Sequence, residues 1–425
     1  MPGRHVLLLA LLLSLGSCNL LKLDQQMQQA HQQLQLVSGQ LRASDSGNSA
    51  WVALLDEHSQ VLEYRISAPR EGFYFTVAPG HYQLLAFEDR NANFRLDRDE
   101  PRQWLQTAQT TALAVQPNPN QWQQLIQLNP IELHSRSLAA APKLDLRLQV
   151  LYGQQPRLQS NYLQPISLND VRFDPQSVSL GAWQPLTFIQ QFGYGLYLLA
   201  PWDKDKEPIF LVHGINSSPR DWQELLAKLD LRHFQPVLFH YPSGLPLNNS
   251  AYLLSVAMRD VQLRYGPRRM HIFAHSMGGL LARRAVQQLS PSDDQRLCLF
   301  ITLSTPWAGH PSAASGVRDV PLDIPLWRDL APGSAYLQRL FANPLPAHMR
   351  QWLLVSYSGN NSLLPTPNDG VVPLASELDN HAQDEAEQLF MLAEDHNSIL
   401  SSSRSSQLLN RALASLPSKG CRGKN

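Results

Sequence analysis

The serine at position 276 lies between an apolar strand and a helix, in a segment that leaves the chain little conformational choice. Residues 269–274 form an apolar run, and residues 280–286 have helical spacing. Ala274 and Gly278, two residues before and after the serine, are small enough for a very tight turn. Such a strand–turn–helix exposes the serine oxygen at a helix N-terminus, where the dipole stabilises developing negative charge. Ser276 is therefore the candidate nucleophile.

From residue 172 onward the chain alternates short apolar strands with helical stretches, which is typical of a parallel sheet in an α/β fold. Residues 208–212 and 297–303 are continuous apolar runs, as strands covered on both faces require. We therefore expect a doubly wound, mostly parallel sheet over 172–415, followed by a tail at 416–425.

The first of these strands runs into His213-Gly214-Ile215-Asn216. With this turn and the serine turn, the sequence resembles the α/β-hydrolase superfamily, and bacterial lipases in particular. The resemblance implies an oxyanion hole made by the backbone N–H groups of Ile215 and Met277, two donors fixed before the reaction. We interpret His213 as structural, because in this fold the base follows the nucleophile in the chain.

An acid and a base are then expected in the order Ser, acid, His. Asp369, in Asn368-Asp369-Gly370-Val371-Val372-Pro373, resembles the acid of lipase-like members, and it follows the apolar strand 352–357. His396 stands in an Asp-His-x-x-Ile setting similar to that of the lipase base. The residue types leave other candidates for both roles: Asp329, Asp379, Asp384 and Asp395 for the acid, and His381, His310 and His348 for the base.

A segment rich in Pro, Leu and Trp at about 310–348 follows Ser304-Thr305-Pro306, which resembles a loop of the lipases. Residues 329–337 resemble the same grouping in lipases and in GPI inositol-deacylase-like proteins. The segment is predicted to be a cap over an acyl pocket. An insertion that packs on its own core explains the same composition equally well.

The N-terminus reads as a secretory signal, residues 1–17, with a basic start and an apolar run too short to span a bilayer. Leu15-Gly16-Ser17-Cys18 resembles the lipobox of bacterial lipoproteins, which implies lipidation of Cys18 and a cell-envelope location. In that family Asn19, rather than Asp, favours the outer membrane. The alternative is a plain signal peptide with a chance cysteine.

Residues 18–47, rich in Gln and Leu, are predicted to form a tether. Short apolar or alternating runs separated by turn residues at roughly ten-residue intervals predict a small all-β, sandwich-like accessory domain at 48–140. Residues 141–171 are expected to be a linker.

One loop of this β-domain has the spacing of an EF-hand calcium loop. Its first, third, fifth, ninth and twelfth positions are Asp89, Asn91, Asn93, Asp97 and Glu100. Phe94 stands where the loop's sharp turn calls for glycine. A polar hairpin end held by Asx-turns is the competing interpretation.

Charge excludes one class of partner. The chain has 35 Lys+Arg and 35 Asp+Glu, so it lacks the positive surplus that nucleic-acid binding needs. Cys298 and Cys421, the two cysteines besides Cys18, could pair in an oxidising compartment. A buried free thiol is the commoner explanation for a cysteine in apolar surroundings such as those of Cys298, and the sequence does not decide between the two.

These features predict a serine hydrolase of carboxylic esters, a lipase or esterase and in its narrower forms a phospholipase or lysophospholipase, that needs no metal or organic cofactor. An acyltransferase or amidase would use the same three residues. A non-catalytic outer-membrane lipoprotein with a retained hydrolase fold is the third hypothesis.

Overall fold

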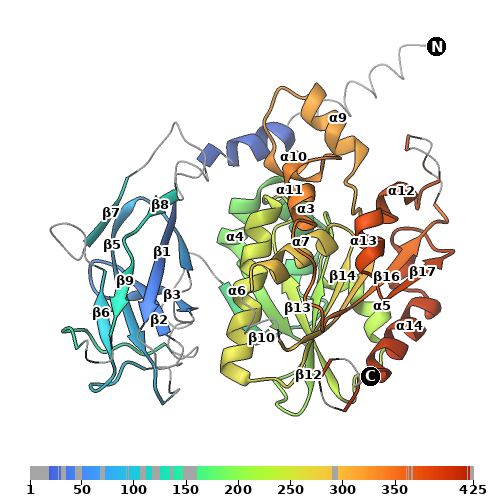
Figure 1. Cartoon of the computed structure of the whole chain (residues 1–425). Coiled ribbons are helices and arrows are strands. Elements are labelled where there is room, and N and C mark those ends of the chain that lie inside the picture. Colours follow the sequence, from blue (N-terminus) through green and yellow to red (C-terminus); the bar gives the residue numbers. More distant parts are fainter. Residues whose placement is uncertain are drawn as a thin grey trace. The chain divides into compact units, whose positions relative to one another are not determined.

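The computed structural model describes residues 19–26, 28–29, 35–43, 50–67, 72–91, 93, 95–105, 112–116, 125–134, 136, 138–146, 160–289, 295–359, 361, 363–364, 367–418 and 420–421. It separates into two compact units (Figure 1). The β unit is Gln25–Leu158, and the α/β unit is Gln159–Asn425 together with the segment up to Asp24.

The β unit consists of two sheets with the strand orders β4-β1-β8 and β3-β2-β5-β6. β9 also pairs with β1, and β7 with β5. Apolar side chains of both sheets, such as Phe73 and Val52, form one core between them. This arrangement is the expected sandwich. Its strands are β1 (Gln35–Ala43), β2 (Ala50–Leu55), β3 (Val61–Ser67), β4 (Gly72–Val77), β5 (Gly80–Glu88), β6 (Arg102–Trp104), β7 (Ala112–Val115), β8 (Leu125–Gln127) and β9 (Ile131–Leu133).

Two predicted boundaries of this unit are wrong. The range 18–47 is not all tether, because β1 lies within it and buries Val37 and Leu41 in the core. The range 141–171 is not all linker, because Leu144 and Leu146 are buried beneath the second sheet and β10 (Ser160–Pro165) belongs to the other unit. Both segments depend on pairing or packing with distant residues, which local patterns do not reveal.

The α/β unit is built on an eight-stranded sheet with the order β10-β11-β13-β12-β14-β15-β16-β17. All neighbouring strands are parallel except for one pair, β11 and β13, which is antiparallel. The doubly wound, mostly parallel sheet is thus confirmed. Its other strands are β11 (Tyr194–Leu198), β12 (Glu207–Val212), β13 (Phe234–His240), β14 (Met270–His275), β15 (Leu297–Leu303), β16 (Arg350–Ser356) and β17 (Gln388–Leu392).

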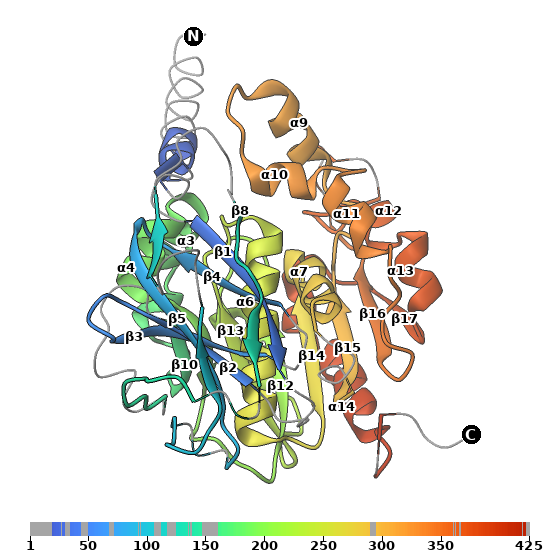
Figure 2. The same ribbon diagram turned by 60° about the vertical axis from the view of Figure 1, so that its left-hand side comes forward.

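Helices cover both faces of this sheet (Figure 2). On one face, apolar side chains of α5 (Gln223–Leu226) and α14 (Ser403–Ala414) pack on alternate strand residues such as Ile209 and Leu211. The other face carries α6 (Leu247–Tyr265) and α7 (Met277–Gln287), while α3 (Pro175–Trp183) and α4 (Pro185–Phe192) precede β11. Central strands therefore have no solvated face, which explains their unbroken apolar runs.

Three short helices fill the segment predicted as a cap: α9 (Pro311–Asp319), α10 (Pro325–Leu330) and α11 (Ala335–Leu340). They pack on one another, since a methyl group at Gly316 would lie 2.4 Å from the Trp327 ring. Tyr336 of α11 donates a hydrogen bond to Leu280 O of α7. The segment thus rests on the helix that follows Ser276.

A disulfide joins Cys298 of β15 to Cys421 near the C-terminus. The predicted tail is therefore tied to the sheet, and Cys421 is buried. The Arg269 guanidinium also donates to Gly420 O at 3.3 Å. A cross-link between residues 123 positions apart restricts the unfolded chain strongly.

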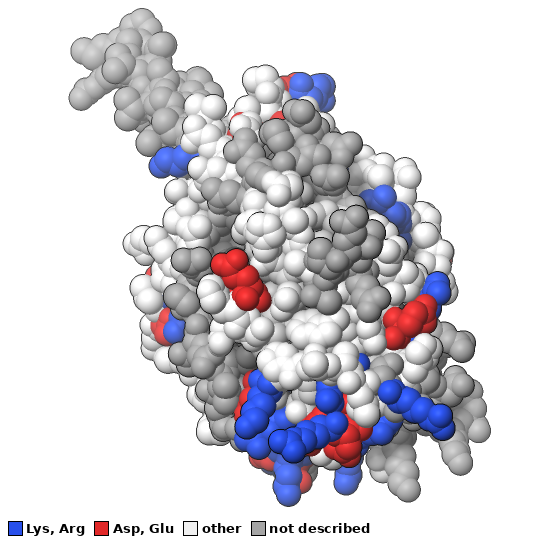
Figure 3. Space-filling view, turned by 90° about the vertical axis from the view of Figure 1, so that its left-hand side faces the viewer, with Lys and Arg blue, Asp and Glu red and all other residues white. Residues whose placement is uncertain are grey.

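Charges on the face drawn in Figure 3 gather at one end, where Lys and Arg alternate with Asp and Glu. The other residues coloured in that view are mostly uncharged. Among the described helices, none is both long and apolar enough to cross a bilayer.

Removing the disulfide is expected to destabilise the α/β unit by about 2–5 kcal/mol, because the unfolded chain regains the freedom of a long loop. Denaturant midpoints of the wild type and of a Cys298→Ser/Cys421→Ser variant measure the effect. Dithiothreitol should lower the wild-type midpoint toward that of the variant and leave the variant unchanged. Equal midpoints in all samples would show that the two thiols do not pair.

Candidate active site

Ser276 occupies a strained turn between β14 and α7. Its φ of 55° and ψ of −132° lie outside the regions that residues with a side chain ordinarily adopt, and such backbone strain costs roughly 1–3 kcal/mol. Two hydrogen bonds hold the turn: Ser276 N–H donates to Leu303 O at 2.8 Å, and Gly279 N–H donates to Ser276 O at 3.0 Å.

Two glycines make room for this turn. A Cβ at Gly278 would lie 2.5 Å from His213 O, and a Cβ at Gly214 would lie 2.8 Å from Ser276 Cβ. Both distances are far shorter than real carbon contacts, so neither position accepts a side chain without movement of backbone or of Ser276. The small residue seen two positions after the serine therefore has a direct steric cause.

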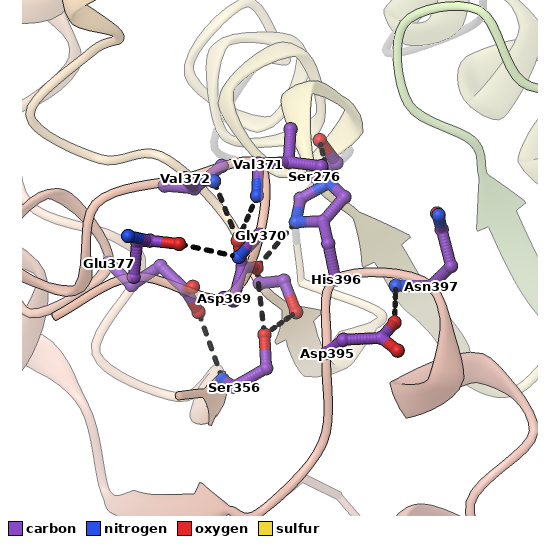
Figure 4. Close-up of polar contacts among 12 residues, drawn as sticks. Ser276, Ser356, Asp369, Gly370, Val371, Val372, Glu377, Asp395, His396 and Asn397 are labelled. Carbon is purple, nitrogen blue, oxygen red and sulfur yellow. Dashed lines mark hydrogen bonds and ion pairs between the residues drawn. The ribbon is translucent and has the colours of Figure 1, made fainter. Parts of the chain in front are cut away.

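The structure brings together Ser276, His396 and Asp369, which lie on three separate loops at one end of the sheet strands (Figure 4). Ser276 Oγ is 2.9 Å from His396 Nε2, and His396 Nδ1 is 2.6 Å from Asp369 Oδ2. With the hydroxyl donating to Nε2 and Nδ1–H donating to the carboxylate, the imidazole is oriented as a base toward the serine. All three side chains are buried.

Four donors surround the Asp369 carboxylate. Oδ1 accepts the N–H groups of Val371 and Val372 at 2.9 and 2.6 Å, and Oδ2 accepts His396 Nδ1–H and the Ser356 hydroxyl. Burial opposes ionisation, but the hydrogen bond and charge of His396 and the two N–H groups outweigh it and lower the pKa of Asp369 to about 2. The carboxylate therefore stays ionised at any ordinary pH.

His275, next to the serine, fixes the loop of the base. Its Nε2–H donates to His396 O at 2.8 Å, and its ring lies 4.8 Å from that of His396. Burial, and then the nearby His396, lower the pKa of His275 to about 3, so the ring is neutral. A neutral ring holds the base in place without adding a competing charge.

Residues that follow β13 hold the loop expected to form the oxyanion hole. The Tyr241 hydroxyl donates to His213 O at 2.8 Å, and Asn216 N–H donates to Ser243 Oγ at 3.2 Å. Burial lowers the pKa of His213 to about 4, so this ring is neutral and packs on Tyr241. The His213 ring contacts Gly214 O, His240 and Tyr241, which agrees with its structural interpretation.

The two N–H donors expected to form the oxyanion hole come from two different loops next to Ser276. Met277 is the first residue of α7, and Ile215 follows the glycine that touches Ser276. Within the described part of the chain, neither N–H has a hydrogen-bond partner. Free N–H groups at these positions are what an oxyanion hole needs.

The competing candidates lie elsewhere. Asp329 caps α6 through Leu247 N–H, and Asp379 caps α13 (Asn380–Glu385) through His381 N–H. Asp384 and Asp395 are exposed, as is the His381 ring. His310 caps α9 and contacts Val371 O, while His348 is half-buried between α11 and β16.

Four polar residues around the triad were not anticipated from the sequence: His275, Ser304, Ser356 and Glu377. Ser356 Oγ bonds to Asp369 and also contacts Ser304 Oγ at 2.6 Å. A serine that ends the apolar strand 350–356 is a weak sequence signal for such a role. Glu377 carries no local signal, because only the fold brings it near Asp369.

The calcium loop folds as a hairpin end in which the proposed ligands bond to one another and to backbone. Asp97 accepts the side-chain amides of Asn91 and Asn93 at 2.9 and 2.8 Å. Glu100 accepts the N–H groups of Arg90 and Asp97, and Asp89 accepts that of Asn93. The described residues contain no cluster of three or more His, Cys, Asp or Glu placed to hold a metal. Calcium binding here stays a prediction. Cys18 lies outside the described residues.

Comparison with known proteins bears on the α/β unit. Residues 209–414 match the alpha/beta hydrolase family, and a comparison with curated proteins gives no match.

Among solved structures, the mature lipase BlEst2 of Bacillus licheniformis is 16% identical over 50% of this chain and 92% of its own, with a TM-score of 0.40. Lipase B of Aspergillus fumigatus is 14% identical, over 52% of this chain and 55% of its own (TM-score 0.39). The phospholipase PlaB of Legionella pneumophila is 16% identical, over 40% of this chain and 45% of its own (TM-score 0.34). The sheet order, the serine turn and the family match identify the α/β unit as an α/β-hydrolase fold.

Proposed function

We propose that this protein is a serine hydrolase that cleaves carboxylic esters with Ser276, His396 and Asp369. The observation that carries the proposal is the hydrogen-bonded chain from the serine hydroxyl through the imidazole to an ionised carboxylate, at 2.9 and 2.6 Å. Each group has the partner that its chemical role requires, before any substrate is bound.

In the proposed reaction, His396 Nε2 removes the Ser276 proton as Oγ attacks the ester carbonyl carbon. Asp369 stabilises the imidazolium and keeps its tautomer. The N–H groups of Ile215 and Met277 then receive the negative charge that develops on the carbonyl oxygen. The imidazolium protonates the leaving alkoxide. Water, activated by the same histidine, releases the acid and restores Ser276.

An apolar acyl or alcohol group fits the surroundings of the serine. Ile215 and Val371, from the oxyanion loop and the acid loop, are both partly exposed although apolar. His310, at the start of the cap helices, donates to Val371 O at 2.6 Å and so ties that segment to the acid loop. We propose an acyl lipid, such as a phospholipid or lysophospholipid, or another apolar ester as substrate.

We further propose that Cys18 carries a lipid and anchors the protein in the bacterial envelope, in the outer membrane. The lipobox resemblance supports this location, and so does the Cys298–Cys421 disulfide, since disulfides persist in oxidising compartments. An anchored enzyme would meet membrane lipids at high local concentration.

Esters of p-nitrophenol with short and long acyl chains should be hydrolysed by the protein that begins at Leu20. Ser276→Ala should lower kcat at least ~10⁴-fold, because no other group can form the acyl-enzyme. A fluorophosphonate probe should label the wild type and not the variant. Hydrolysis by Ser276→Ala at the wild-type rate would reject this serine, and no hydrolysis or labelling of the wild type would favour the non-catalytic hypothesis.

Asp369→Asn should lower kcat by about 10⁴-fold, because the amide favours the wrong tautomer of His396. Since the pKa of Asp369 is about 2, protonation of this carboxylate should not add to any loss of wild-type activity above pH 4. A pH profile of kcat/KM between pH 4 and 9 should therefore show at most one acid limb. Asp384→Asn, at an exposed position, is the control and should keep full activity; a second acid limb would contradict the assignment.

Cys18→Ser should release the full chain from the membrane fraction, because each buried lipid CH₂ contributes ~0.8 kcal/mol to anchoring. Fractionation of expressing cells, with metabolic labelling by a palmitate analogue, measures both location and acylation. Cys298→Ser controls for nonspecific labelling of cysteine. If the wild type is not labelled, Cys18 is not lipidated, and the alternative of a plain signal peptide with a chance cysteine remains.

A further inference from the structure

A second carboxyl group lies buried against the triad. Glu377 ends α12 (Leu374–Glu377), and 1% of its surface is exposed. Its Oε2 accepts Ser356 N–H at 3.1 Å. Its Oε1 has no hydrogen-bond partner among the described residues, and the hydroxyl of the same Ser356 donates to Asp369 Oδ2 at 2.9 Å. Figure 4 shows the two carboxyl groups on the same side of Ser356.

Glu377 and Asp369 are both buried and both bond to Ser356, and two carboxyl groups so close together away from water strongly disfavour a second negative charge. Asp369 is the ionised member, because its two oxygens receive four donors, from Val371, Val372, His396 and Ser356. No Lys or Arg within the described residues forms an ion pair with Glu377 to compensate a second charge. The proton must therefore be on Glu377.

We propose that Glu377 is a positioning residue that stays protonated and donates a hydrogen bond to the ionised catalytic acid Asp369. As a neutral acid it bridges Ser356 N–H of β16 and the Asp369 carboxylate. It restrains the Asp369 carboxylate from the side opposite His396. Because it is neutral, it adds no negative charge that would favour protonation of the His396 imidazole, and a protonated imidazole could not accept the Ser276 proton. The catalytic part of this inference rests on the proposed function.

The electrostatic surroundings agree with the geometry. Burial first, and then the charge of Asp369, raise the pKa of Glu377 well above its usual value, and the Ser356 N–H only partly opposes them. Asp369 is the charged group that faces Glu377 from the acid loop, while β16 contributes the uncharged Ser356. His396 lies beyond Asp369.

The protonation of Glu377 can be tested without any enzyme activity. In the unfolded chain this carboxyl ionises near its ordinary pKa of 4.5, whereas in the folded chain it keeps its proton. The folded state then binds more protons above this pH, so the stability of the wild type falls as pH rises. Glu377→Gln, neutral in both states, lacks this dependence.

The stability gap, which is the free energy of unfolding of Glu377→Gln minus that of the wild type, should therefore increase steadily from pH 5 to 8. The ratio of their unfolding constants should change by up to ~10-fold per pH unit. Denaturant unfolding of the full chain measures it, with Glu224→Gln, exposed on α5, as the control that keeps a constant gap. A constant gap for Glu377→Gln as well would show an ionised Glu377 and overturn the proposal.

Activity tests the positioning role. Glu377→Leu, which removes both hydrogen bonds, should lower kcat about tenfold or more with little change in KM, and Glu377→Gln should recover most of that loss. The acid limb of kcat/KM in Glu377→Gln should stay at its wild-type pH, since one neutral group replaces another. A shift of that limb to lower pH, or equal losses in both variants, would overturn the role.

The two tests fail separately. If the wild type hydrolyses no ester, the proposed function fails, while the unfolding experiment still reports whether Glu377 is protonated. If esters are cleaved and Ser276→Ala is inactive but the stability gap is flat, only the inference about Glu377 fails.

Discussion

The left-handed backbone of Ser276 is the constraint on which the site depends. It bends the chain sharply from β14 into α7, so the hydroxyl stands clear of the strand and the N–H of Met277 stays unpaired. The turn closes only because Gly278 approaches His213 O and Gly214 approaches the serine itself. One hydrogen bond to β15 and one within the turn offset part of the backbone strain, and the packed sheet holds the remainder. The proposed nucleophile and one proposed oxyanion donor are thus fixed by a single steric arrangement.

Around this turn the molecule buries an unusual number of polar groups for a core position. His275, His213, Ser356 and Glu377 are all shielded from water, and a buried polar group is costly unless it is paired. Each has a partner that belongs to the site or to its support: His396 O, Gly214 O, Asp369 and Ser356 N–H respectively. The network therefore resists rearrangement, and it holds His396 and Asp369, the proposed base and acid, in fixed orientations.

Segments remote from the triad in sequence stabilise it at its edges. The cap helices rest on α7 through Tyr336 and contact the acid loop through His310. The Pro-rich insertion is therefore hydrogen-bonded to the elements that carry Ser276 and Asp369. On the opposite side, the disulfide at Cys298 fastens the C-terminus to β15, whose backbone receives the Ser276 N–H. The strained turn is thereby held between elements that cannot move independently.

Local physics explains what the sequence determined by itself. Tight turns admit only small residues, and strands buried on both faces need unbroken apolar runs, so the Ser276 turn and the parallel sheet could be predicted from it. Asp369 and His396 were expected from the lipase resemblance and the chain order of that fold, because residue types alone left other candidates. Tertiary structure decided the rest. β1 and β10 are strands because distant partners bury or pair them, and Glu377 comes near Asp369 because both carboxyl groups bond to Ser356 of β16. Side-chain proximity between residues without a shared local pattern has no signature in a single sequence, because it arises from the packing of the whole unit.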